Sequence, residues 1–305
     1  MPIAFTEYLN AKYALDSRSL NPIAYHSLLR TLESRSHLRW LDLGTGTGAM
    51  IHRLVEAFSI ANIEAVGLDR DQTILASAAL TSQQRLQEQG YTIANRDHFM
   101  HARSDTQSLT LKYICQNIRS PIPNKQNTFD LVTAHAFMDV VPLMQTVKLI
   151  ADNLVEGGLF YSTLNYDGET TLFPVYQDFA FEHEILNHYD QSMENRGVDG
   201  QATGGAYSGR RLVTTLQANG FDIIAYGSSD WNITPVHDQY LDQDQTCITA
   251  LLDMIHGEAT HLPLLDQAKL QAWYQERMHR IEQQQLGLII HQMDVLARIS
   301  HQKEK

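Results

Sequence analysis

The feature that most constrains the fold is a largely apolar segment that runs directly into a glycine-rich loop. Residues 38–43 include one acidic residue, Asp42, and the next five residues read Gly-Thr-Gly-Thr-Gly. After the loop, apolar residues recur at helical spacing over residues 49–60. Glycine adopts positive φ and has no Cβ, so such a loop lets the backbone approach a ligand closely. The helix that follows offers unpaired N–H groups. The stretch therefore predicts a cradle for a nucleotide cofactor.

Short apolar segments and amphipathic segments alternate along the first half of the chain. This alternation predicts an α/β fold with a mostly parallel sheet and helices on both faces. Right-handed crossovers place the carboxyl ends of all parallel strands at one edge, where such sheets bind ligands. The expected strands are residues 38–43, 63–68, 109–118, 129–137, 159–165 and 221–226. Residues 286–299 suit a final strand, although their pattern alone leaves a helix open.

The remaining segments predict one domain with helical insertions rather than two domains. Residues 91–107 are polar and unpatterned, and we expect a surface insertion there. The expected parts of the domain 1–305 are an N-terminal helical cap (1–36), a cofactor-binding core (37–165), a lid insertion (166–207) and a C-terminal part (208–305) with a helical insertion (236–285).

Composition and charge exclude several classes of protein. The formal net charge is −12, which disfavours broad binding to nucleic acid. The two cysteines, Cys115 and Cys247, are far apart, so neither a disulfide framework nor a cysteine metal site is expected. No signal peptide and no membrane span are apparent, which predicts a soluble, cytoplasmic protein.

The glycine loop fits two kinds of cofactor. Gly44, Gly46 and Ala49 formally match the dinucleotide pattern G-x-G-x-x-A, and Asp69 follows at a suitable distance. This would make the protein an NAD(P)-dependent oxidoreductase. However, Asp42 stands two residues before the first glycine, where a carboxylate suits an ammonium group and repels a pyrophosphate. The elements also do not restart as two mononucleotide-binding halves.

Taken together, these motifs resemble those of the class I S-adenosylmethionine-dependent methyltransferases. The sequence L-D-L-G-T-G-T-G at 41–48 matches the first motif of that family, and Gly67-Leu68-Asp69 matches the acidic end of its second strand. Phe129-Asp130-Leu131-Val132 matches the start of its fourth strand. The resemblance implies a Rossmann-like, seven-stranded, mostly parallel sheet in which an antiparallel last strand, residues 286–299, inserts next to the fifth.

The resemblance also implies roles for individual residues toward S-adenosylmethionine. Asp42 would hold the ammonium group directly or through water, and Asp69 would accept both ribose hydroxyls. Arg70 would lie along the adenine, and Asn117 would offer its side-chain oxygen to the adenine amino group. The full expected cofactor-binding set is Asp42, Gly44, Thr45, Gly46, Gly48, Asp69, Arg70, Gln116, Asn117, Ala134 and His135.

The acceptor is less constrained than the cofactor. Methyl transfer mainly requires alignment and exclusion of water, and needs a base only when the acceptor must lose a proton. His135 leads as a candidate base, because imidazole titrates near neutral pH, and an equally good alternative is a polar wall residue without proton transfer. Tyr166 and Arg211 are further catalytic candidates, with Asp139, Tyr161 and Asp167 also expected at the rim.

Motifs that are absent from the sequence narrow the subclass of methyltransferase. No Asn/Asp-Pro-Pro-aromatic sequence follows the fourth strand, and no metal-ligand pair appears there, so a metal-independent reaction is expected. The acidic lid favours a small, amine-bearing or cationic acceptor. A regulatory protein that binds the cofactor without turnover, or an enzyme that methylates protein or RNA, remains an alternative. The oligomeric state is open.

Overall fold

The computed structural model describes residues 3–300 apart from 119, 121, 123–127 and 264. Its larger elements alternate as the sequence predicts. In chain order they are α1 (Phe5–Ser19), α2 (Pro22–Leu32), β1 (His37–Leu43), α3 (Ala49–Ala57), β2 (Asn62–Asp69), α4 (Gln72–Glu88), β3 (Thr92–Arg96), β4 (Phe99–Arg103), β5 (Ser108–Cys115), β6 (Phe129–His135), α5 (Leu143–Asn153), β7 (Leu154–Phe173), α6 (Phe179–Glu194), β8 (Gly197–Val198), β9 (Gln201–Ala202), α7 (Ser208–Ala218), β10 (Phe221–Ser228), β11 (Trp231–Ile233), α8 (Asp244–Ala259), α9 (Gln267–Glu282) and β12 (Gly287–Ile299).

The main sheet has the strand order β10-β12-β7-β6-β1-β2-β5-β4-β3. Its central strands β7, β6, β1, β2 and β5 are parallel. Strand β12 lies between β7 and β10 and is antiparallel to both. This confirms the predicted Rossmann-like arrangement, including the antiparallel last strand at 286–299; the helical alternative for that segment is wrong.

The sheet is wider than the seven strands expected from the sequence. Residues 91–107, expected as a surface insertion, form the hairpin β3–β4, which pairs antiparallel with the edge strand β5. Strand β3 is largely exposed, and only Met100 and Ala102 of β4 are buried. The alternation of apolar and polar residues that marks a half-buried strand is therefore weak there. Strand β11 pairs with β12 outside this order.

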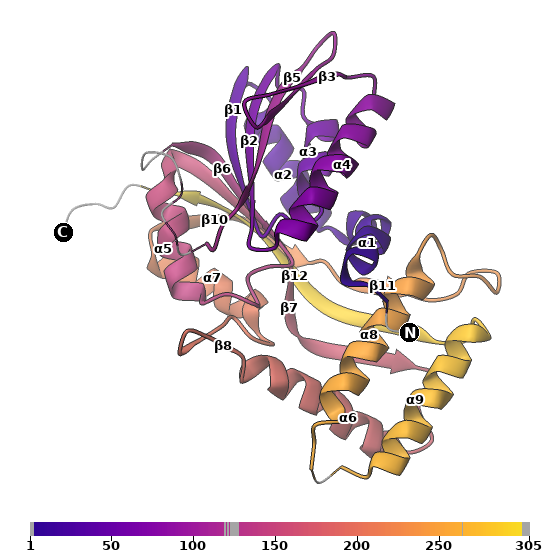
Figure 1. Ribbon diagram of the computed structural model, residues 1–305. Helices are drawn as coiled ribbons and strands as arrows, with labels where there is room; N and C mark the ends of the chain where they lie inside the picture. Colours follow the sequence, from indigo (N-terminus) through magenta and orange to yellow (C-terminus); the bar gives the residue numbers. More distant parts are fainter. Residues whose placement is uncertain (1–2, 119, 121, 123–127, 264, 301–305) are drawn as a thin grey trace.

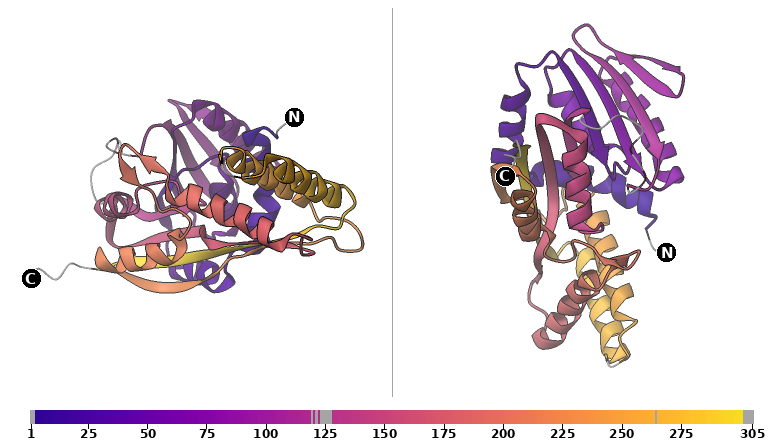
Figure 2. Two further views of the ribbon diagram at one scale, coloured as in Figure 1. Left: turned by 90° about the horizontal axis from the view of Figure 1, so that it is seen from below. Right: turned by 90° about the vertical axis from the view of Figure 1, so that its left-hand side faces the viewer.

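Helices cover both faces of the sheet (Figures 1 and 2). On one face, α2, α3 and α4 pack on the sheet around Leu28, Leu54 and Leu86. On the other face, α5 and α7 pack around Val147 and Leu212. Each helix contributes an apolar stripe, which is the pattern expected of a helix that lies between a sheet and solvent.

A second, helical part of the molecule is built on two long strands. Strands β7 and β12 continue past the end of the central strands and carry α6, α8 and α9 with them (Figures 1 and 2). Residues 166–173, which the sequence places at the start of the lid, are thus the outer half of β7. A further hydrophobic core, which includes Ile185, Ile248 and Trp273, lies among these helices and strands.

Helix α1 joins this helical part to the sheet. It packs against α8 and β11, and its C-terminal end meets α2 at Asn21. The Asn21 side chain accepts hydrogen bonds from the N–H groups of Ile23 and Ala24, so it is the N-cap of α2, as the Asn-Pro break between the two helices suggests. The Asn21 N–H donates to the Asp294 carboxylate on β12. These hydrogen bonds at the C-terminal end of α1 therefore help to fix its position relative to the sheet. None of the described helices is long and apolar enough to span a membrane.

Candidate active site

A cavity of about 470 Å³ opens at the carboxyl ends of β1, β2 and β6. This volume lies within the range of small-molecule and cofactor sites. Six segments form its walls: the glycine loop, the end of β2 with the start of α4, the segment after β5, the loop after β6, strand β8, and one face of α1. The predicted residues that line it are Gly44, Thr45, Gly46, Asp69, Arg70, Gln116, Asn117 and His135.

The glycine loop is held in a conformation that glycine favours. The φ angles of Gly44, Gly46 and Gly48 are +61°, +53° and +80°. The Thr45 N–H donates to the carbonyl of Leu68 at 2.8 Å, which fixes the loop to the end of β2. A Cβ on Gly44 would lie 2.1 Å from the Phe137 ring, so backbone and ring are in direct contact there. The loop thus has the tight, open-faced geometry that the sequence predicts.

Asp69 lies in the cavity wall at the end of β2. One carboxylate oxygen accepts the N–H of Gly46 at 3.0 Å, and the other accepts the N–H of Asp71 at 3.0 Å. These bonds fix the carboxylate between the glycine loop and the start of α4. Each oxygen retains a further lone pair, so the group can still accept two adjacent hydroxyls.

Asp42 lies beneath the loop, not in the cavity wall. It is 1% exposed, and it faces its cross-strand neighbour Thr133, whose hydroxyl donates to it at 2.5 Å. The Trp40 indole N–H in turn donates to the Thr133 hydroxyl at 2.7 Å. Burial raises the pKa of Asp42 to about 6, although hydroxyl groups of Thr133 and Thr45 oppose this rise. A cation bound above the loop would therefore favour the ionised form.

Two other residues of the predicted set also lie outside the cavity wall. Gly48 precedes α3, and a Cβ there would lie 2.4 Å from the Tyr113 hydroxyl, so it is needed for packing. Ala134 is completely buried in β6. Both support the site from behind.

His135, at the end of β6, lines the cavity but has both ring nitrogens occupied. Its Nε2 lies 2.9 Å from Asp16 Oδ2 on α1, and its Nδ1 lies 2.7 Å from the hydroxyl of its cross-strand neighbour Thr163. Burial lowers the pKa of His135 to about 4, although the hydrogen bond to Asp16 opposes this. The imidazole is therefore neutral near pH 7 and has no free nitrogen for an acceptor proton. The predicted role as a base finds no support here.

The other catalytic candidates lie away from the cavity wall. The Tyr166 hydroxyl donates to Asp190 at 2.6 Å within the helical part, and burial raises its pKa. Arg211 forms a bidentate ion pair with Glu194 at 2.9 and 2.8 Å and lines a different, open groove. Their positions along the chain predicted that Tyr166 and Arg211 lie near the carboxyl ends of the strands. In the structure, the extension of β7 and the position of α7 place both residues away from the cavity. Asp167 likewise pairs with Arg210, at 3.0 Å.

The sequence predicts an N-terminal helical cap, but it did not identify which residues of α1 face the cavity. Phe5, Leu9 and Lys12 line the cavity, and Asp16 lies behind them. Their spacing of four, three and four residues places all four on one helix face. The signal available in the sequence was that the charged residues Lys12 and Asp16 lie on the same helix face as the apolar residues Phe5 and Leu9. Across the cavity, Val198 of the β8–β9 hairpin also contributes to the wall.

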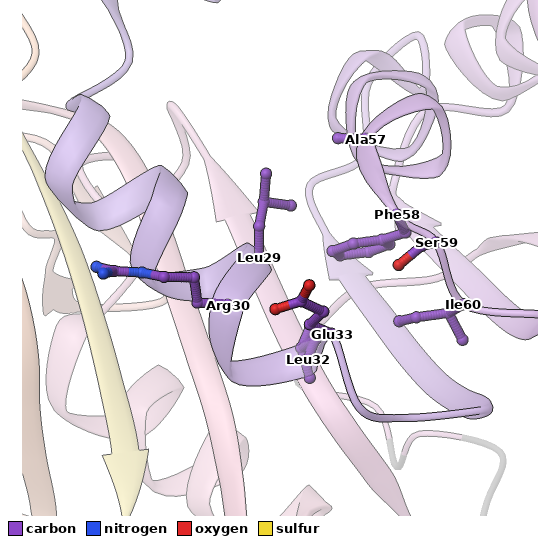
Figure 3. Close-up of a pocket in the computed structure, with 8 residues that line it drawn as sticks. All are labelled: Leu29, Arg30, Leu32, Glu33, Ala57, Phe58, Ser59 and Ile60. Carbon is purple, nitrogen blue, oxygen red and sulfur yellow. The ribbon is translucent and has the colours of Figure 1, made fainter.

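A second cavity, of about 220 Å³, lies between the end of α2 and the segment after α3 (Figure 3). It includes Leu29, Glu33 and Phe58 and lies toward the starts of β1 and β2. Ligand sites in open parallel sheets lie at the carboxyl ends of the strands. The larger cavity is therefore the candidate active site.

The larger cavity suits S-adenosylmethionine. Positive-φ glycines leave the loop face open to the methionine part, and Asp69 presents two acceptors for the ribose. Ile74 and Ile118 give an apolar surface for the adenine. No cluster of three or more metal-binding side chains occurs among the described residues. Fold and site together define a nucleotide-cofactor enzyme with a Rossmann-like sheet.

Comparison with known families identifies the class. Residues 14–196, more than half of the chain, match the methyltransferase domain family. The chain belongs to this family and is an S-adenosylmethionine-dependent methyltransferase. This decides between the two cofactors that the glycine loop permits, and the dinucleotide interpretation is wrong.

The chain is similar to solved structures at low sequence identity, and the structure from Bacillus halodurans shares its fold. A protein from Bacillus halodurans, provisionally named a methyltransferase, is 12% identical with a TM-score of 0.52, and the match covers 90% of this chain and 98% of that one. A protein from Galdieria sulphuraria, provisionally named a sarcosine dimethylglycine methyltransferase, is 14% identical with a TM-score of 0.48 (96% and 88% covered). Phosphoethanolamine N-methyltransferase 2 from Haemonchus contortus, solved with S-adenosyl-L-methionine, is 12% identical with a TM-score of 0.45 (97% and 57% covered). No curated protein matches the chain significantly.

Proposed function

We propose that this methyltransferase transfers the methyl group to a small, amine-bearing acceptor without a metal. S-adenosylmethionine supplies a methyl group on a positively charged sulfur, and the acceptor lone pair displaces that sulfur in line. The loop at Gly44 and Gly46 would hold the methionine part, Asp69 the ribose, and Gln116 and Asn117 the adenine edge. Asp42 would favour the ammonium group from below the loop.

The enclosure of the site supports a small acceptor. Beyond the loop the cavity is bounded by α1, by His135 and by Val198 of the hairpin. Because residues of both α1 and the hairpin line the cavity beside the glycine loop, we propose that a polymer has little access to the methyl position. This part of the cavity is the proposed acceptor site, and residues 174–207 together with α1 are its proposed lid.

The observation that carries the amine proposal is the state of Asp139, which is not itself part of the cavity wall but directly precedes the wall residue Val140 on the loop after β6. Its Oδ1 is buried and has no hydrogen-bond partner among the described residues. Burial raises the pKa of this carboxyl group, although Arg196 and Lys12 lie close enough to oppose the rise. Its charge also contributes, after burial, to the raised pKa values of Tyr8 and Tyr189. A buried carboxylate that interacts electrostatically with two tyrosines is suited to an amine or ammonium group.

The experiment that tests the proposal measures methyl transfer from labelled S-adenosylmethionine to separate pools of small amines, alcohols, thiols and carboxylic acids. We expect turnover only in the amine pool. The D139N variant should lose most of that activity through a higher KM and should bind S-adenosylmethionine with unchanged affinity in calorimetry.

The matched control is D222N, which removes an exposed carboxylate on β10. It should behave as the wild type. Turnover confined to another pool, or a D139N variant with wild-type kinetics toward amines, would refute the amine proposal while leaving cofactor binding intact.

A further inference from the structure

We infer that Asp16 is a positioning residue for the methyl donor: it fixes the α1 wall of the cofactor cavity and the orientation of the His135 ring. The inference concerns S-adenosylmethionine binding and does not depend on the acceptor class.

Asp16 brings together three donors, one from the preceding turn of α1 and two from distant parts of the chain. Its Oδ2 accepts from Lys12 Nζ at 2.6 Å and from His135 Nε2 at 2.9 Å. Its Oδ1 accepts from the Trp231 indole N–H at 3.0 Å. The carboxylate is 1% exposed, so these bonds are shielded from water. One buried charge thus connects α1, the end of β6 and β11.

The protonation states in this cluster follow from the contacts. Burial disfavours ionisation of Asp16, but the Lys12 ammonium and the His135 hydrogen bond hold its pKa below the ordinary range. An ionised carboxylate can only accept, so His135 donates from Nε2. In a neutral imidazole the other nitrogen is an acceptor, so Nδ1 accepts from the Thr163 hydroxyl. Asp16 therefore sets both the tautomer and the ring orientation of His135.

The cluster also fixes the wall that faces the cofactor. Lys12 and His135 both line the cavity, and Leu9 lies one turn before Lys12 on the same face of α1. The Leu9 side chain lies over the glycine loop, 3.7 Å from where a Cβ on Gly46 would be. Holding α1 at Asp16 therefore holds Leu9 and Lys12 at the cavity. A freed α1 would leave the loop without its cover.

A purely structural role for Asp16 makes different predictions. A buried carboxylate with three donors stabilises any fold, and its removal lowers the melting temperature. A positioning residue additionally changes the affinity for S-adenosylmethionine and the state of His135. The two can be separated by measuring all three quantities.

The test uses the D16N variant and, as a matched control, D190N. Asp190 on α6 accepts from the Tyr166 hydroxyl at 2.6 Å and lies outside the cavity wall. We expect D16N to raise the Kd for S-adenosylmethionine by about tenfold to a hundredfold in calorimetry, as for loss of charge-assisted hydrogen bonds. Hydrogen exchange should accelerate in α1 of D16N. D190N should keep its Kd within about twofold of the wild type.

A measurement on the wild type remains decisive if D16N does not fold. Nitrogen-15 NMR of the histidine rings, assigned with an H135Q variant, should show His135 as the Nε2–H tautomer with no titration between pH 5 and 8. An Nδ1–H tautomer, or titration in that range, would overturn the inference. So would a D16N variant that loses thermal stability as D190N does but keeps the wild-type Kd.

Discussion

At the residue scale, the shape of the cofactor site depends on positions where one additional carbon atom would collide with a neighbouring side chain. The contact between Gly44 and the Phe137 ring is the clearest case. Gly44 has φ of +61°, and the ring occupies the space that a side chain would need. Phe137 belongs to the loop after β6, so its contact with Gly44 packs the glycine loop against a second wall of the cavity. The loop is thereby shaped by tertiary contact as well as by its own sequence.

Gly44→Ala should weaken binding of S-adenosylmethionine by about fivefold to a hundredfold, because the Cβ must displace Phe137 at a cost of about 1–3 kcal/mol. The control is Gly157→Ala, which has a similar φ of +69° with no atom within 4 Å of the new Cβ. That variant should lose about 1 kcal/mol of stability and no affinity. Calorimetry and denaturant unfolding measure both. Equal affinities in the two variants would contradict the prediction.

Asp42 predicts a pH dependence of cofactor binding. Its pKa in the free protein is about 6, and an ammonium group above it favours the carboxylate. Affinity for S-adenosylmethionine is therefore fully present at about one pH unit above 6 and should fall, by up to about tenfold per pH unit, as the pH drops below 6. D42N should bind more weakly and without this dependence. Calorimetry from pH 5 to 7 tests the slope.

The control ligand for Asp42 is 5′-methylthioadenosine, which lacks the ammonium group. Its affinity for the wild-type protein should be constant over the same pH range. If S-adenosylmethionine binds equally well at pH 5 and 7, Asp42 does not sense the ammonium group.

At the element scale, the helical part is fastened by a buried ion pair. Arg277 of α9 is 0% exposed and forms a 2.7 Å ion pair with Glu182 of α6. Glu182 also accepts the Trp273 indole N–H at 2.9 Å, and Arg277 donates to the carbonyl of Pro174 at 3.1 Å. The ion pair and these two hydrogen bonds together hold α9 against α6. Because α6 leads into the β8–β9 hairpin, the pair also helps to position Val198.

Glu182→Gln should destabilise the protein by about 3 kcal/mol, because it removes the nearer counter-charge of a buried guanidinium and leaves only Glu276, at 3.4 Å. The control, Lys269→Ala, removes an exposed ion pair at 3.5 Å between the same two helices and should cost less than about 1 kcal/mol. Denaturant unfolding measures both. Similar losses of unfolding free energy in the two variants would show that the buried ion pair contributes no more to stability than the exposed one.

At the scale of the whole molecule, charge and shape both favour a small acceptor. The net charge of −12 repels phosphate backbones, and α1 and the hairpin enclose the proposed acceptor site. The parallel sheet supplies the cofactor site, while the extension of β7 and β12 supports the helices beside it. Methyl donor and acceptor are thus assigned to separate parts of one cavity.

The whole-molecule charge predicts that RNA does not bind. We expect no retention of RNA in filter binding at about 50 mM salt, where counterion release would favour even non-specific binding. Retention that disappears as salt is raised would instead support methylation of RNA. Adding S-adenosylmethionine should make no difference to the result.

Most of the central sheet was predictable, because buried parallel strands appear as apolar segments and their helices as periodic ones. The β3–β4 hairpin was missed, because exposed strands lack that signal. In the candidate site, the positions of Gly44, Gly46 and Asp69 in the cavity wall were predictable because they depend on local backbone geometry. Tyr166 and Arg211 were placed near the cavity by their position in the chain, which does not determine where a long strand carries its end.

The sequence determined the methyl donor, through its motifs together with its match to the methyltransferase domain family. The glycine loop and the strand-end carboxylates Asp42 and Asp69 lie within one βαβ unit, and local backbone geometry suffices to assemble them. Only the tertiary structure decided what surrounds the donor. Asp16 meets His135 and Trp231 across 119 and 215 residues of chain, and such contacts leave no pattern in either local sequence. They arise because the sheet order brings β6 and β11 to the helix that covers the glycine loop.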